Sequence, residues 1–297
     1  MKALTTRSPR KMMCLVVLLL GLGLCAQGAL AQQAGAMPSA AGPPVRMMLV
    51  DPGPIGVNTT TALFAQVAIG EGYTTVFTLM NTGTSDLSGV LVLTTGVDGS
   101  PMNATFSEPP AAPITAGSFD IAPIRPGGTR FITAGPPNPG DALKVGWARV
   151  ESSGGTIGGV GTFEVTQAGK LTTIAGVLAG SPLNVATIPV NNDGAKNRFT
   201  GYAIANPSNA SINVKIVVVD VNGVPVQTLN LPKLNPLPPR QQVARFLHQD
   251  VPSLLTFQGS MVLIGQSGNE FSVVALVLDQ NLITAIPVIP SKAPGIN

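Results

Sequence analysis

The chain has 297 residues, of which only 10% are charged and 44% are hydrophobic. Disordered chains combine low hydrophobicity with high charge, so this composition excludes that class. Glycine (34 residues) and proline (27 residues) are abundant but do not follow the G-X-Y period of collagen. The composition therefore predicts a globular, turn-rich protein, and it does not identify a molecular function.

The N-terminus has the three parts of a secretory signal peptide. Residues 1–11 carry four basic side chains and no acid, an apolar run extends from Met12 to Leu24, and Ala29-Leu30-Ala31 forms an A-x-A cleavage site. The apolar run is shorter than the roughly 20 residues that a membrane-spanning helix needs. The sequence thus predicts a signal peptide over 1–31, no stable transmembrane segment after cleavage, and a secreted, periplasmic or cell-surface protein.

Cleavage after Ala31 would change both the charge and the cysteine content. The mature chain would keep 13 basic and 14 acidic residues, a net charge of −1. Its basic residues are scattered, whereas a polyanion partner needs them clustered, so we expect no nucleic-acid partner. Cys14 and Cys25 would leave with the signal peptide, so we expect no disulfide, thiolate nucleophile or cysteine-based metal site.

The pattern that follows is that of an all-β protein. Residues 32–60 are rich in Ala, Pro and Gly and are predicted to be a lead-in, with one short candidate strand at Val45–Val50. From Leu63 onward, β-branched runs alternate with Gly, Pro, Asn and Asp, as in β-sandwiches. Only Gln242–Leu247 and Val251–Leu255 could each form a turn of helix. The predicted strands are Leu63–Ala68, Thr74–Met80, Gly89–Thr94, Ser118–Ile121, Arg130–Thr133, Leu143–Val150 and Gly159–Val165. Thr166–Ala186 is predicted to be a linker with one candidate strand at Leu171–Leu178.

Sequence anchors recur in one order at a nearly constant offset, which indicates a tandem duplication. Asn81 and Asn206 each end an alternating strand, 125 residues apart, and the turn dipeptides Asp98-Gly99 and Asn222-Gly223 lie 124 residues apart. Such dipeptides favour hairpins because glycine adopts positive φ freely. We therefore expect two β-sandwich domains, over 61–176 and 177–290, followed by a tail over 291–297.

Two proline-containing phrases and one glycine-rich stretch indicate sheet edges and a turn rather than a binding site. Ile188-Pro189-Val190 and Ile286-Pro287-Val288 place prolines where sheet edges are expected, because proline cannot donate to a strand ladder. Gly154–Gly161 feeds a strand rather than a helix, so it favours a hairpin or bulge over a nucleotide loop.

The phrases Phe64–Leu79, Gly201–Pro207 and Ala244–Leu247 resemble repeats in bacterial secreted proteins of undefined role. More broadly, Leu63 to Pro290 is similar to immunoglobulin-like or fibronectin-III-like sandwiches. The resemblance implies two tandem antiparallel sandwiches and supplies no catalytic residues. The Cys…Trp…Cys spacing of true immunoglobulin domains is absent.

Candidate chemistry is sparse. His248, with Asp250 nearby, could be a general base, but no G-x-S-x-G elbow accompanies it, and a partly packed loop histidine is the alternative. One histidine without cysteine makes a transition-metal site improbable. The acidic residues form no recognisable pair for glycoside hydrolysis. We therefore assign no catalytic, cofactor-binding or metal-binding residue.

Ligand binding has several candidate positions, each with a structural alternative. Asn191–Gly194 and Asp220–Gly223 could supply oxygens to calcium, although neither fits an EF-hand loop and such residues favour turns by themselves. Trp147, Tyr73 and Tyr202 could stack on a sugar or pack in the core. The glycosylation patterns at Asn58, Asn103 and Asn209 carry little meaning in a bacterial host.

The sequence thus favours a non-enzymatic exported protein for adhesion, scaffolding or cell-surface association, with an unidentified protein or glycan as partner and no cofactor. A carbohydrate- or calcium-binding module is the alternative, and a carboxylate-only hydrolase is the third.

Overall fold

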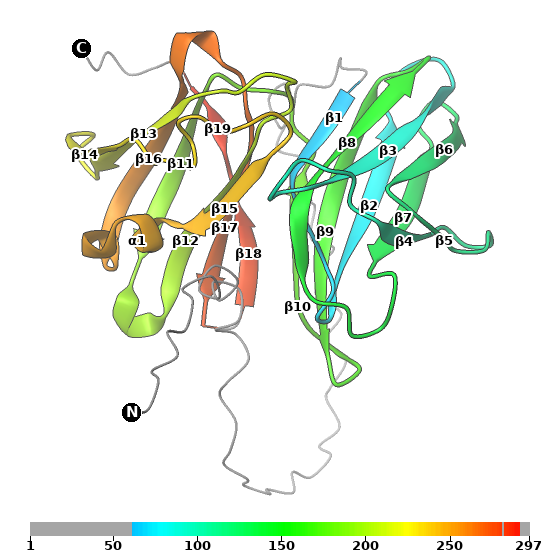
Figure 1. Ribbon diagram of the computed structural model, residues 1–297, viewed down its shortest axis with the longest axis horizontal. Coiled ribbons are helices and arrows are strands. Elements are labelled where there is room, and N and C mark those ends of the chain that lie inside the picture. The colour runs from blue at the N-terminus through cyan, green and yellow to red at the C-terminus, as the bar shows by residue number, and fades with distance from the viewer. Residues whose placement is uncertain (1–60, 281, 292–297) are drawn as a thin grey trace, which may run out of the picture. The chain divides into compact units, whose positions relative to one another are not determined.

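The computed structural model describes residues 61–280 and 282–291, and these belong to one compact unit, Gly53–Asn297 (Figure 1). Several predictions lie outside the described residues: the signal peptide, the lead-in with Val45–Val50, both cysteines, Asn58 and the tail beyond Ser291.

The described chain is all-β, as predicted, and its strands form four antiparallel sheets. The first two sheets, together called the first sheet pair, have the orders β1-β8-β3-β6 and β10-β9-β2-β7-β4-β5. Their strands are β1 (Thr61–Ile69), β2 (Tyr73–Asn81), β3 (Leu87–Thr95), β4 (Ala104–Ser107), β5 (Ile114–Ala116), β6 (Ser118–Ile124), β7 (Thr129–Gly135), β8 (Lys144–Ser153), β9 (Ile157–Gln167) and β10 (Lys170–Leu178).

The other two sheets form the second sheet pair, with the orders β14-β13-β16-β11-β19 and β15-β12-β17-β18. A four-residue helix, α1 (Leu247–Asp250), and three short 3₁₀ turns lie in its connections. Its strands are β11 (Val185–Asn192), β12 (Arg198–Ala205), β13 (Val214–Asp220), β14 (Pro225–Leu229), β15 (Gln242–Phe246), β16 (Phe257–Gly265), β17 (Ser272–Asp279), β18 (Leu282–Ile286) and β19 (Ile289–Pro290).

The strand order repeats between the two sheet pairs. The order β1-β8-β3-β6 corresponds to β11-β16-β13-β14, and β10-β9-β2-β7 corresponds to β18-β17-β12-β15. The order differs from that of immunoglobulin domains, where the first two strands are sheet neighbours. Here β1 pairs with β8, in the sheet opposite β2.

The equivalent residues Asn81 and Asn206 make similar hydrogen bonds in the two sheet pairs. The Asn81 side-chain amide donates to the carbonyls of Ser85 (2.7 Å) and Ile124 (2.8 Å). The Asn206 amide donates to the carbonyls of Ala210 (2.7 Å) and Pro238 (2.9 Å). Both asparagines are buried, so these bonds satisfy polar groups that water cannot reach. Each asparagine thus connects the end of its strand both to a carbonyl four residues later and to one more than 30 residues away.

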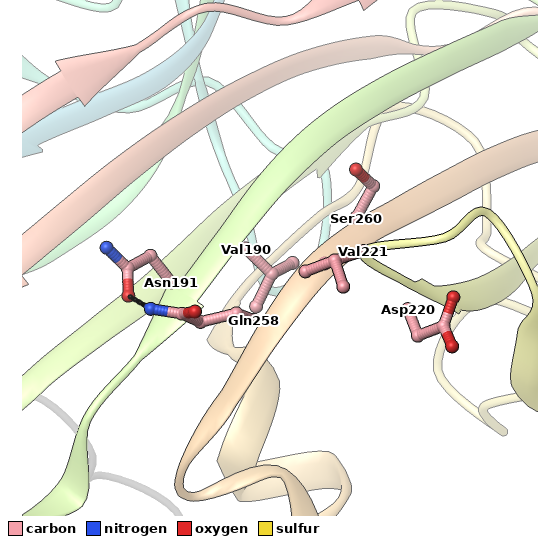
Figure 2. A pocket seen from close by; sticks show the side chains of 7 residues that line it. Val190, Asn191, Asp220, Val221, Gln258 and Ser260 are labelled. Atoms are coloured by element: carbon pink, nitrogen blue, oxygen red, sulfur yellow. Dashed lines mark hydrogen bonds between the residues drawn. The ribbon is translucent and has the colours of Figure 1, made fainter.

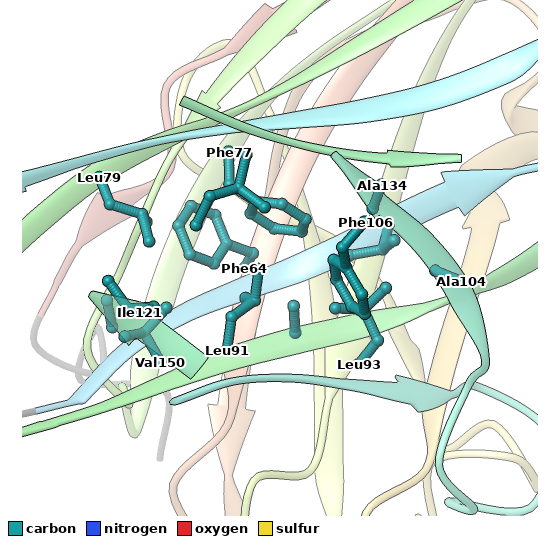
Figure 3. Packing of buried hydrophobic residues seen from close by; sticks show 14 of the residues in the cluster. Phe64, Phe77, Leu79, Leu91, Leu93, Ala104, Phe106, Ile121, Ala134 and Val150 are labelled. Atoms are coloured by element: carbon teal, nitrogen blue, oxygen red, sulfur yellow. The ribbon is translucent and has the colours of Figure 1, made fainter. Parts of the chain in front are cut away.

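Four hydrophobic clusters lie among the described residues; the smallest is Val185, Val217 and Val262, and the other three are the main cores. One lies between the sheets of the first pair and includes Phe64 and Phe77, whose rings meet edge to face at 5.1 Å (Figure 3). A second lies within the second sheet pair and includes Tyr202 and Phe271. The third, which we call the shared core, contains residues from both pairs: Leu63, Ala65, Ala68, Trp147, Phe163, Ala175, Val177, Ala203, Ala205 and Val274.

The shared core exists because some strands are apolar on both faces. Along β1, Phe64 points into the first core while its neighbours Leu63 and Ala65 join the shared core. Along β12, Ile204 points into the second core while Ala203 and Ala205 join the shared core. Successive side chains point to opposite faces of a strand, so a continuous apolar run marks a strand buried on both sides.

Hydrogen bonds reinforce the shared core. The Gln242 side-chain amide donates to the carbonyl of Ala65 (2.8 Å) and to the Gln66 side-chain oxygen (2.6 Å). The Trp147 indole N–H donates to the carbonyl of Arg240 at 2.7 Å. All three bonds connect the two sheet pairs, and they satisfy polar groups at an apolar contact.

The structure corrects several details of the sequence analysis. Gln242–Leu247 is one of the two segments that could form a turn of helix, but Gln242–Phe246 is strand β15, because it pairs with five residues of β12. Tertiary pairing overrides a weak local preference here. The sequence missed β4 and β5 as strands, and β10 continues to Leu178, past the expected domain boundary at residue 176.

The turns were predicted with mixed success. Asn222-Gly223 does connect a hairpin, β13 to β14. Asp98-Gly99 makes only a local reversal, because the strands before and after it belong to different sheets. The Gly154–Gly161 stretch likewise starts as a crossing from β8 to β9 in the opposite sheet, so of the hairpin or bulge expected there, the hairpin is not formed.

The prolines lie where strand pairing is incomplete. Pro189 pairs with β16, while the partner strand on its other side, β19, covers only Ala186 and Thr187. Pro287 lies between the end of β18 and the start of β19. Both positions agree with a residue that cannot donate to a ladder.

Candidate functional site

A shallow open pocket of about 380 Å³ lies across one end of three neighbouring strands, β11, β16 and β13 (Figure 2). The central strand contributes Gly259, which lies opposite Val190 on one neighbour and Asp220 on the other. A Cβ at Gly259 would lie 2.8 Å from the Phe257 ring, so the absence of a side chain here leaves room for that ring. The pocket lining is Val190, Asn191, Asp220, Val221, Gln258, Gly259 and Ser260.

The polar groups of this pocket come from side chains held by local structure. The Gln258 amide donates to the Asn191 side-chain oxygen at 3.3 Å, across a pair of facing strand residues. One oxygen of Asp220 accepts from the backbone N–H groups of Asn222 (2.8 Å) and Val224 (2.9 Å), which shapes the β13–β14 turn. The pocket therefore offers amide, carboxylate and hydroxyl groups beside Val190 and Val221, a mixture suited to a hydroxylated ligand.

The pocket brings together two segments that the sequence had singled out separately. Asn191 belongs to one predicted calcium turn and Asp220 to the other. Sequence spacing could not show this juxtaposition, because it depends on β11 and β13 both pairing with β16. Gln258 and Ser260 were not predicted as site residues, and nothing in their local sequence marks them.

The remaining members of the calcium turns serve the fold. Asp193 accepts from the N–H groups of Ala195 (3.1 Å) and Lys196 (3.3 Å), and pairs with the Lys196 ammonium at 3.0 Å. These contacts lower the pKa of Asp193, with the Lys196 contact as the largest cause. Asn192 is buried and donates to the Leu254 carbonyl at 2.8 Å. Within 61–280 and 282–291, no three His, Cys, Asp or Glu side chains gather as a metal site would require.

Two of the three aromatic candidates, Trp147 and Tyr202, are buried in the interior, and Tyr73 is partly buried. Trp147 is fully buried in the shared core, and the Arg149 guanidinium lies 6.0 Å from its ring. Tyr202 is buried in the second core, and Tyr73 packs against the shared core. The structural alternative for Trp147 is therefore confirmed.

His248 lies on α1 between two aromatic rings, with centroid distances of 4.1 Å to Phe199 and 5.9 Å to Phe246. Its Nδ1 atom is buried and has no hydrogen-bond partner. Burial lowers the pKa of His248, while Asp250 opposes this shift. A general base needs an orienting partner on this nitrogen, and the structure does not provide one.

Asp250 is held by other groups. The Tyr202 hydroxyl donates to one of its oxygens at 2.6 Å, and Arg245 pairs with the other. Burial raises the pKa of Tyr202 well above its usual value, and the Asp250 charge adds to this shift. The Tyr202–Asp250–Arg245 group thus anchors α1 to β12 and β15, and does not join His248 in a catalytic pair.

Comparisons of the chain with protein-family models, with curated proteins and with solved structures find no match. Among the described residues, no helix is long and apolar enough to cross a bilayer. The similarity to immunoglobulin-like repeats therefore stays a resemblance.

Proposed function

We propose that this protein is an exported, non-enzymatic binding protein in which two sandwich domains act as one scaffold. The observation that carries the proposal is the shared core. Two tandem domains joined only by a linker would each keep a polar surface where they meet. Here apolar side chains of both sheet pairs, with Trp147 fully buried, pack against one another instead. Such a contact holds surfaces of the two sheet pairs at fixed positions, which a scaffold requires.

Export is tested by locating the chain and finding its N-terminus. We expect the full-length precursor to be processed, so that mass spectrometry of the protein from the envelope fraction or medium finds Gln32 as the first residue. Replacing the apolar Leu18 and Leu19 by arginine should stop this processing, because it breaks the core of the signal peptide. An unprocessed chain that remains in the cytoplasm would contradict the proposal.

The binding role is tested separately with labelled full-length protein. We expect saturable binding to intact cells or isolated envelope of its own source, and no hydrolysis of the bound material. Absence of binding to cells, envelope and polysaccharides alike would contradict a binding role, whereas turnover of any of these materials would favour the hydrolase.

A second candidate function is carbohydrate binding at the pocket of β11, β16 and β13. It is favoured by the exposed amides of Asn191 and Gln258 beside the Asp220 carboxylate. Isothermal titration with soluble polysaccharides tests it. We expect Asn191→Ala and Gln258→Ala to weaken binding about tenfold each, since each removes hydrogen bonds to the ligand. Gln227→Ala, on exposed β14 and outside the pocket, is the matched control. Binding that survives both pocket substitutions would place the sugar elsewhere.

A further inference from the structure

The outward face of the sheet β10-β9-β2-β7-β4-β5 is an almost uncharged surface. Along β2, Phe77 and Leu79 point into the first core, so their neighbours point outward. We call this surface the β2 face and define it by its central residues on β2, β7 and β9. They are Val76, Thr78, Phe131, Thr133, Val160 and Thr162.

The strand register places these side chains in a regular grid. Thr78 lies opposite Phe131 on β7 and Val160 on β9. In the next row, Val76 lies opposite Thr133 and Thr162. Directly opposed side chains lie about 5 Å apart, so the grid forms a continuous surface of methyl groups, hydroxyls and one aromatic ring.

This face exposes large apolar groups without charges to keep them solvated. Phe131 is 62% exposed, and at the rim Met80 is 43% and Leu178 is 63% exposed. Among the described residues of β2, β7 and β9, Glu164 is the one charged side chain on this side, since Arg130 points to the other side and pairs with Glu108 at 3.0 Å. An apolar patch that is depleted of charge is typical of a protein interface.

The equivalent face of the second sheet pair is covered. The offset between Asn81 and Asn206 makes Thr78 equivalent to Ala203 and Met80 equivalent to Ala205. Both alanines are buried in the shared core, where β12 contacts strand β1 of the first sheet pair. The same face of the repeated fold is thus an interface in one sheet pair, whereas in the other the described residues leave it uncovered.

We propose that the β2 face binds the β2 face of a second copy of this chain, in a twofold symmetric dimer. Two copies of an uncharged face bury one another without stranding charges. A twofold axis through the centre of the face, between β2 and β7, places the two Glu164 carboxylates on opposite halves, so they do not meet. Face-to-face packing of twisted sheets is an established geometry, with a spacing of about 10 Å.

The size of the face agrees with a stable homodimer. Six strands about 4.8 Å apart and about seven residues long cover roughly 29 by 23 Å. That footprint, about 670 Å² before side-chain relief is counted, is close to the roughly 800 Å² per partner of a standard interface. A charged partner would fit this face poorly, since it offers almost no charge to pair with.

The test is the oligomeric state of the full chain, measured by sedimentation velocity over a range of concentrations. We expect a monomer–dimer equilibrium. Phe131→Glu should weaken the dimer about a hundredfold or more, because the symmetric contact brings two new carboxylates into an apolar interface. Val226→Glu is the matched control, since Val226 is 50% exposed on β14, in a different sheet, and should leave the dimer unchanged.

Cross-linking identifies the face directly. In a Cys14→Ser, Cys25→Ser background, Thr78→Cys or Thr133→Cys supplies the sole thiol of the chain. A short bismaleimide should then produce covalent dimers at these positions but not with Val226→Cys. Trp147 fluorescence and the thermal transition confirm that each variant is folded.

Three results would overturn the proposal. The chain could sediment as a monomer at every concentration, it could form open-ended oligomers that a closed twofold contact forbids, or it could cross-link equally well from Val226→Cys. Each outcome is distinguishable from failure of export or of glycan binding, because the oligomeric state depends on neither.

Discussion

Strands β2 and β12 occupy the same place in the two sheet pairs, yet their outward faces differ. On β12 the outward residues Ala203 and Ala205 are small and buried in the shared core. On β2 the equivalent residues are Thr78 and Met80, which face outward in a surface that the described residues leave uncovered. The inward faces of both strands are alike, with large apolar side chains in a core. The inward faces of the two strands are therefore similar and their outward faces differ. The strand with small outward residues, β12, is the one whose outward face lies in the shared core.

The strongest way to break this arrangement is to empty the centre of the shared core. Trp147→Ala should lower the free energy of unfolding by about 3–5 kcal/mol, because it leaves a large cavity. It also leaves the Arg240 carbonyl without its indole donor. Urea unfolding followed by circular dichroism measures the change. Trp147→Phe, which retains most of the packing and loses the indole donor, should cost clearly less. Equal losses for the two variants would mean that packing at Trp147 matters little.

Exchanging residues between the two outer faces tests the comparison itself. Ala203→Thr should destabilise the protein by about 1–3 kcal/mol, because extra atoms must fit into a filled contact. Thr78→Ala at the equivalent, half-buried position should change stability by no more than about 0.5 kcal/mol. Trp147 is the sole tryptophan, so its emission reports on the contact. A red shift is expected for Ala203→Thr alone, and similar behaviour of both variants would remove the proposed difference.

The two equivalent turn glycines sharpen the comparison at a second place. Gly99 and Gly223 both have positive φ, +72° and +80°, so an alanine at either position costs about 1–2 kcal/mol in backbone strain. A Cβ on Gly223 would meet nothing within 4 Å, whereas one on Gly99 would lie 2.9 Å from the Pro239 carbonyl and from Arg240 Cβ. Thermal unfolding should therefore show a larger loss for Gly99→Ala, by about 1 kcal/mol or more. A larger loss for Gly223→Ala would contradict contact between this turn and the second sheet pair.

The smallest expected effect is a pH dependence of stability that arises in the Asp98-Gly99 turn and not in the equivalent Asn222-Gly223 turn. Asp98 accepts from the hydroxyl of Thr95 and from the N–H (3.0 Å) and hydroxyl (2.7 Å) of Ser100. These bonds, the Thr95 hydroxyl first, lower the pKa of Asp98 from 3.8 to about 2. A depressed folded-state pKa gives stability that is present above pH of about 4 and is lost as the pH falls towards 2.

Carboxyl NMR titration measures this directly. The pKa of Asp98 should rise towards 3.8 in Thr95→Val, because the largest stabilising bond is gone. The equivalent residue in the second sheet pair is Asn222, which does not titrate, so the effect belongs to the first. An Asp98 that titrates near 3.8 in the unchanged chain would contradict the turn geometry.

Most strands could be predicted from local pattern, and the reasons for the failures are physical. Alternating β-branched runs located β2, β3 and β9 within a few residues, because the two-residue period and turn residues are local properties. The segment Gln242–Phe246 was misassigned because its strand conformation comes from pairing with β12. The pocket was only half visible, since Gln258 and Ser260 join Asn191 and Asp220 through sheet order.

The sequence by itself determined the all-β class, the turn positions and the repeated anchors, since all of these follow from the φ/ψ preferences and side-chain period of neighbouring residues. The tertiary structure alone decided which sheet each strand joins, that Trp147 and Tyr202 are buried, and that residues of both sheet pairs form the shared core. These depend on contacts between residues far apart in the chain, such as Gln242 and Ala65, which are 177 positions apart and which no local pattern connects.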